Sequence, residues 1–330
     1  MYGTFGSNKP LVLIVLLIPA VGLAWMASKY AAPISFPLAG GLFDRIDGLF
    51  NDWPIGRLWL GTALILAVAA MIAQLCNTHH LHRRENYFAA LLSFLFISIH
   101  LYWLYFNPII LGLLFLVLTL MRVLTLFRSE RIIARLYDGG LFMGIAVLIY
   151  PPFILVVPIL WIALSMLRPF QLREFLIPFA GVLTPVVFTL FYLFWFESTF
   201  DLTPYTDFHL HLWDNIGFGM GLIEISLSVL CLAISIIGFL AYVAEMSAST
   251  VQKKNTKGVI IVFSSLCLIT WLYSNWVGEA REGLGILLVL PFAIFGGYTF
   301  SNSERPLLAV ISYHVWLALI VVFVMRVFFD

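Results

Sequence analysis

Charged residues are scarce in this chain. Only 11% of its 330 residues are Asp, Glu, Lys or Arg, whereas 62% are hydrophobic. Roughly a quarter of the residues of a soluble globular protein are charged, so this chain has too little polar surface for a water-soluble fold. The composition predicts an integral membrane protein, and it excludes a disordered chain, a collagen-like fibre and a soluble enzyme.

An excess of basic charge is also lacking. The sequence has 18 Lys and Arg against 17 Asp and Glu, a net charge of +1, which excludes nucleic acid as an expected partner. Cysteine is rare too. Cys76, Cys231 and Cys267 lie far apart in apolar runs, which indicates buried free thiols rather than a disulfide framework or a CxxC metal site.

Long apolar runs are what the chain has in abundance. A helix needs about 20 mostly apolar residues to cross a bilayer, and the run from Leu11 to about Ser28 predicts an uncleaved first span rather than a signal peptide. We therefore predict an all-α, polytopic transmembrane helical bundle of about eleven spans in one integral membrane domain, 1–330. The predicted spans are 11–28, 58–76, 87–106, 108–126, 139–150, 152–167, 175–196, 222–245, 258–277, 284–300 and 307–328.

The region around Pro151 and Pro152 decides the parity of this count. Its two segments are short and only these prolines separate them, so they form either a close hairpin or one broken element. With the N-terminus in the cytoplasm, most Lys and Arg fall in inner loops, as the positive-inside rule requires. Counting one span here would move Lys253, Lys254 and Lys257 outward. The charge pattern thus favours two segments and a multi-pass protein of the bacterial inner membrane.

Two predicted periplasmic loops, 29–57 and 197–221, are long enough to hold structure. In the first, apolar residues at helical spacing suit a short amphipathic helix at the membrane surface, on which Asp44 and Asp47 lie about one turn apart. Such a pair could share a divalent metal ion, hold a sugar hydroxyl or act as a general base. It could equally be the solvated face of an interfacial helix. Arg57, His100 and Asp52 are the candidate substrate-binding residues nearby.

The second loop contains two histidines and two acids within eight residues. Asp207, His209 and His211 could bind a divalent metal ion, although an HxH spacing fixes no third ligand. A polar loop that rests on the membrane through its aromatic residues explains the alternation as well. At the inner face, the basic and His-rich stretch 77–84 is explained by topology, with anionic lipid head groups as a further partner.

Several motifs carry a resemblance to known families. The stretch from Asp138-Gly139-Gly140 to Tyr150-Pro151-Pro152, followed by Arg168-Pro169-Phe170 and Arg173-Glu174-Phe175, resembles a bacterial inner-membrane family of unknown function found in the Bacteroidota. More loosely, residues 1–196 resemble the membrane module of the GT-C glycosyltransferases, which use polyprenyl-phosphate-linked sugars. The shared pattern is an inner N-terminus, a long acidic first outer loop and a Gly-rich short helix ending near proline. Residues 197–330 would add a periplasmic loop and four spans.

The GT-C resemblance implies an activity. In that superfamily an acidic residue of the first outer loop is the base or a metal ligand, so the matching candidates are Asp44 and Asp47. One hypothesis is therefore a GT-C-like glycosyltransferase, or a degenerate relative, that handles a lipid-linked sugar at the periplasmic face. The alternative is a non-catalytic membrane subunit or transporter for envelope building, with a membrane-protein partner.

Overall fold

The computed structural model describes residues 12–30, 39, 41–50, 53–82, 85–98, 101–128, 132–169, 171–196, 222–247, 249–277 and 284–302. Within these ranges all regular structure is helical. The α-helices are α2 (Val12–Val15), α3 (Leu17–Tyr30), α4 (Gly41–Gly48), α5 (Pro54–Thr78), α6 (Phe88–Ile97), α7 (Pro108–Leu124), α8 (Ile132–Ile149), α9 (Ile159–Leu167), α10 (Leu172–Phe196), α12 (Leu222–Ser247), α13 (Val251–Val277) and α14 (Val289–Asn302). The 3₁₀ segments are η1 (Leu101–Leu104), η2 (Thr125–Arg128), η3 (Pro151–Val156) and η4 (Leu284–Leu288).

Five of the described helices are long and apolar enough to cross a bilayer: α5, α8, α10, α12 and α13. The 25 residues of α5 rise about 37 Å, which exceeds the roughly 30 Å of the hydrocarbon core. The predicted membrane-helical class is therefore confirmed at this level. The predicted span 307–328 lies outside the described residues, so the total of eleven stays a prediction.

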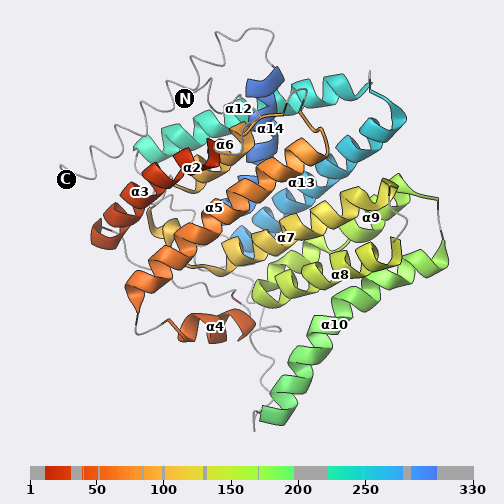
Figure 1. Cartoon of the computed structure of the whole chain (residues 1–330), viewed down its shortest axis with the longest axis horizontal. Coiled ribbons are helices and arrows are strands. Elements are labelled where there is room, and N and C mark those ends of the chain that lie inside the picture. The colour runs from red at the N-terminus through yellow and green to blue at the C-terminus, as the bar shows by residue number, and fades with distance from the viewer. Residues whose placement is uncertain are drawn as a thin grey trace.

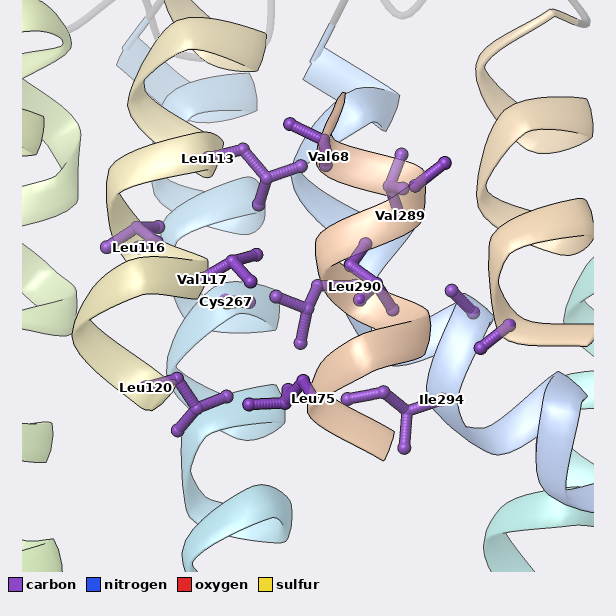
Figure 2. Packing of buried hydrophobic residues seen from close by; sticks show 14 of the residues in the cluster. Val68, Leu75, Leu113, Leu116, Val117, Leu120, Cys267, Val289, Leu290 and Ile294 are labelled. Atoms are coloured by element: carbon purple, nitrogen blue, oxygen red, sulfur yellow. The ribbon is translucent and has the colours of Figure 1, made fainter. Parts of the chain in front are cut away.

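The core surrounds α5. Figure 2 shows side chains of α5 meeting those of α7 on one side and those of α14 on the other, with α13 nearby. The labelled residues are Val68 and Leu75 of α5, Leu113, Leu116, Val117 and Leu120 of α7, Cys267 of α13, and Val289, Leu290 and Ile294 of α14. Since lipid tails are as apolar as these side chains, close van der Waals packing is what favours this association in a membrane.

Two short helices, α6 and α14, lie inside the bundle rather than on its surface. Phe96 and Phe292 meet edge to face with ring centroids 4.9 Å apart, and Phe88 lies 5.6 Å from Phe300. The predicted span 87–106 thus contains a helix of only ten residues, followed by η1. Its non-helical backbone is tolerated because protein surrounds it: Phe106 N–H donates to Arg57 O at 3.0 Å.

Glycines bring α8 and α10 into backbone contact. A Cβ on Gly140 would collide with the carbonyl oxygen of Pro178, and one on Gly144 with that of Val182. On the α10 side, Gly181 lies against Gly140. Small residues four apart let membrane helices approach closely. Beyond this contact, α10 extends from the bundle in Figure 1, and much of its surface is exposed and apolar.

The structure resolves the region around Pro151 as two elements. Helix α8 begins at Ile132, seven residues earlier than predicted, and ends at Ile149, and the prolines then open η3 before α9. The chain passes from residue 82 to residue 245 through α6, α7, α8, η3 with α9, α10 and α12. His82 and Glu245 line one cavity. An even number of passages would return the chain to the same end, which agrees with two segments here, and the number of spans stays a prediction.

The start of α13 departs from the prediction. The predicted span begins at 258, whereas α13 begins at Val251, so Lys253, Lys254 and Lys257 lie on its first two turns instead of in a loop. Lys257 is only 4% exposed. Its charge is therefore part of the folded interior.

Candidate functional site

The predicted amphipathic helix of the first outer loop is α4, which lies beneath the bundle in Figure 1. Its apolar side is anchored by Phe43, whose ring stacks on Phe106 with centroids 5.1 Å apart. Asn107 begins α7 beside this contact, and its side chain caps the helix by accepting the N–H of Ile110 at 2.8 Å. The opposite side of α4 presents Asp44, which is exposed.

Asp47 and Arg57 form an ion pair that ties α4 to the first turn of α5. Arg57 Nη2 donates to Asp47 Oδ2 at 2.7 Å, and the side chains are 17% and 20% exposed, respectively. Within the described residues, Asp47 Oδ1 and Arg57 Nε are buried without a hydrogen-bond partner. The guanidinium and the carboxylate thus each retain unused hydrogen-bonding capacity, because the pair is not bidentate.

Desolvation dominates the electrostatics of this acidic pair. Partial burial raises the pKa of the Asp44 carboxyl, and the neighbouring charge of Asp47 raises it further. Burial also raises the pKa of Asp47, against the opposing charge and hydrogen bond of Arg57. A carboxylate with a raised pKa is a stronger base, which suits proton abstraction.

The structure does not describe the other predicted site residues. Asp52, His100, Asp207, His209 and His211 lie outside the described residues. No group of three His, Cys, Asp or Glu that could hold a metal ion occurs in the described part of the chain. The structure therefore brings Asp44, Asp47 and Arg57 together, and the proposed histidine metal site remains a prediction.

A second polar cluster, at the other end of α5, begins with His82. Its Nε2 lies 3.1 Å from Ile294 O, and its Nδ1 lies 3.2 Å from Asn86 Nδ2. Because the amide of Asn86 is a donor, Nδ1 is the acceptor and Nε2 carries the proton. Burial lowers the pKa of His82 to about 4, although the hydrogen bond to Ile294 O opposes the shift.

Lys257 lies next to this cluster, among three side chains from two other helices. Its Nζ is 3.2 Å from Glu245 Oε2, 4.7 Å from the ring centroid of Tyr242 and 5.4 Å from that of Tyr298. The Tyr298 hydroxyl donates to the same carboxylate oxygen of Glu245. The ammonium group is thus held by an anion and two aromatic faces.

His82 and Lys257 both border a cavity of about 600 Å³. It is lined by Cys76, Asn77, His80, Leu81, His82, Glu85, Glu245, Ser249, Thr250, Lys253 and Lys257. Sequence reasoning assigned the lysines to topology and missed this cluster. The spacing of Lys253 and Lys257 could have revealed the cluster. Residues four apart lie on one face of a helix, and the apolar run that follows Lys257 indicates that this helix continues into the bundle.

Comparison with known proteins gives a family but no activity. No curated protein and no solved structure matches the chain. A family model described as "Family of unknown function (DUF6427)" matches residues 34–328. Because this match covers most of the sequence, including α4 and the helices of both polar clusters, the chain belongs to the DUF6427 family.

Proposed function

We propose that the protein is a bacterial inner-membrane enzyme that transfers a sugar from a polyprenyl-phosphate carrier at the periplasmic face. The observation that carries this proposal is the juxtaposition of α4 and α5, which puts exposed Asp44 one turn from the Asp47–Arg57 pair. A base and a cation side by side at an outer membrane surface match what such a reaction requires. The loose GT-C resemblance of residues 1–196 agrees with this assignment.

Each residue has a separate role in this mechanism. Asp44 takes the proton of the acceptor hydroxyl as its oxygen attacks the anomeric carbon of the sugar. The bond from that carbon to the carrier phosphate breaks, and the phosphate leaves with the bonding electrons. Arg57, whose side chain is 17% exposed, donates from its guanidinium to the phosphate oxygens. Asp47 holds Arg57 in place.

Complementation of a deletion strain tests this proposal without a known substrate. Asp44→Asn should abolish rescue at a normal membrane level, because the amide cannot accept the proton. Asp138→Asn is the matched control: this partly exposed acid lies on α8 and pairs with Arg122 at 3.7 Å, away from α4. Full rescue by Asp44→Asn would refute the mechanism. Transfer from lipid-linked sugars by purified protein is the next assay.

The second candidate is a non-catalytic membrane subunit or transporter for envelope building. It is favoured by the Asp47–Arg57 bond, because an ion pair can fix α4 on the bundle without any chemistry. In that case the charge-reversed pair, Asp47→Arg with Arg57→Asp, should restore rescue that either single change abolishes. The enzyme proposal predicts no restoration, since the cation would move to α4. Co-purification of a stoichiometric membrane protein would also favour this candidate.

A further inference from the structure

We propose that the cavity at the start of α13 is a binding site for a phosphate monoester, with Lys257 and Lys253 as its charged donors. The cavity lies at the opposite end of α5 from α4 and has no role in the proposed transfer. At about 600 Å³, it is within the usual range for small-molecule sites. Under the predicted topology it opens to the cytoplasm.

The hydrogen-bonding state of Lys257 points to a missing acceptor. The residue is 4% exposed, its Nζ is buried, and no hydrogen bond to Nζ is formed within the described residues. Glu245 lies 3.2 Å away, so the charge has a counterion, but the contact lacks hydrogen-bond geometry. A buried ammonium with three donors is costly unless acceptors reach it. A ligand oxygen in the cavity would supply one.

The N-terminus of α13 contributes further donors. Thr250, which precedes this 27-residue helix, lines the cavity with Lys253 from its first turn. Ser249 lines it too, but its amide and hydroxyl donate to Met246 O and Glu245 O. Helix N-termini favour anions because their first amides lack intrahelical partners and the dipole is positive there. Lys253 and Lys257 are four residues apart, so both face the cavity from one side of α13.

The lining also holds two acidic side chains, Glu85 and Glu245, beside Lys253 and Lys257. Glu245 accepts the Tyr298 hydroxyl and pairs with Lys257, so these two charges partly neutralise each other inside the protein. Glu85 is exposed and lies where solvent screens it. A phosphate monoester fits the remaining donors because it offers three acceptor oxygens and nearly two negative charges. The monoester is either a lipid head group or a soluble phosphate compound.

Thermal unfolding of the full chain in detergent, followed by tryptophan fluorescence, tests this site. The probes are inorganic phosphate at constant ionic strength and, separately, nanodiscs of phosphatidylcholine with or without phosphatidic acid. We expect one of the probes to raise the Tm of the wild type. Lys253→Gln should weaken the apparent affinity roughly tenfold through loss of one charged hydrogen bond. Exposed Lys254, which does not line the cavity, provides the matched control Lys254→Gln.

Each outcome bears on the proposal. Stabilisation by inorganic phosphate supports a soluble ligand, and stabilisation by phosphatidic acid alone supports a lipid head group. Lys257→Met, which retains the apolar stem between the two rings, should abolish either effect. If it fails to fold, exposed Lys253 still decides the question. No stabilisation by any probe, or equal affinities for the Lys253→Gln and Lys254→Gln variants, would overturn the proposal.

Discussion

Acidification should destabilise the protein through the buried imidazole of His82. In the folded state Nδ1 accepts from Asn86 and Nε2 donates to Ile294 O. A proton on Nδ1 would replace that acceptor with a second donor facing the Asn86 amide. The folded protein therefore resists protonation until the pH nears the pKa of about 4, whereas an unfolded histidine binds a proton near pH 6.5.

The sign and size of the effect follow from linkage. Between these two pKa values the unfolded state binds more protons, so stability is fully present above about pH 6.5 and falls as the pH drops toward about 4. At about pH 5 the loss is about 2 kcal/mol, since each pKa unit corresponds to roughly 1.4 kcal/mol. For a protein of this size the Tm should fall by roughly 3 °C.

Variants isolate the contribution of His82 from that of other groups. Burial also lowers the pKa of nearby His79 to about 4, so the wild-type pH profile contains both. His82→Gln retains a donor for Ile294 O but does not titrate; it should lower the Tm at about pH 7.5 and flatten the acid slope. His80→Gln, at an exposed position, is the control. An acid slope in the His82→Gln variant as steep as that of the wild type would refute this account.

Two further predictions concern packing and topology. Gly140→Val should destabilise the protein by about 3 kcal/mol or more, seen as a lower Tm, because its side chain would meet the α10 backbone; Gly139→Ala, whose added Cβ has its nearest neighbours at 3.6 to 3.8 Å, should not. A membrane-impermeant maleimide should label Leu49→Cys on intact cells and Thr250→Cys only after permeabilisation, against a background of buried native cysteines. Labelling of both from one side would contradict the assigned topology.

The acidic site was accessible to sequence reasoning because its geometry is local. Asp44 and Asp47 are three residues apart on one short helix, and Arg57 lies in the first turn of the next. Helical periodicity and loop position therefore identify them together. The bond between Asp47 and Arg57 was not predicted, since it depends on how α4 folds back onto α5.

The cluster around Lys257 was not accessible in this way. Glu245, Lys257 and Tyr298 come from three helices, and only the packing of α12, α13 and α14 brings them together. Hydropathy has a related limit at 87–106. An apolar run indicates that a segment is shielded from water, but the interior of a bundle shields it as well as lipid does. The run therefore does not reveal that α6 ends at Ile97.

The shortness of α6 has a consequence for biogenesis. Ten helical residues rise about 15 Å, half the thickness of the hydrocarbon core, so α6 is not an independent span that the insertion machinery can release into lipid. Its interior partner α14 is synthesised far later, and Phe292 and Phe300 supply the aromatic contacts that α6 lacks until then. Until α14 is made, α5 is the neighbouring helix against which α6 can pack, so the last steps of assembly follow synthesis of α14.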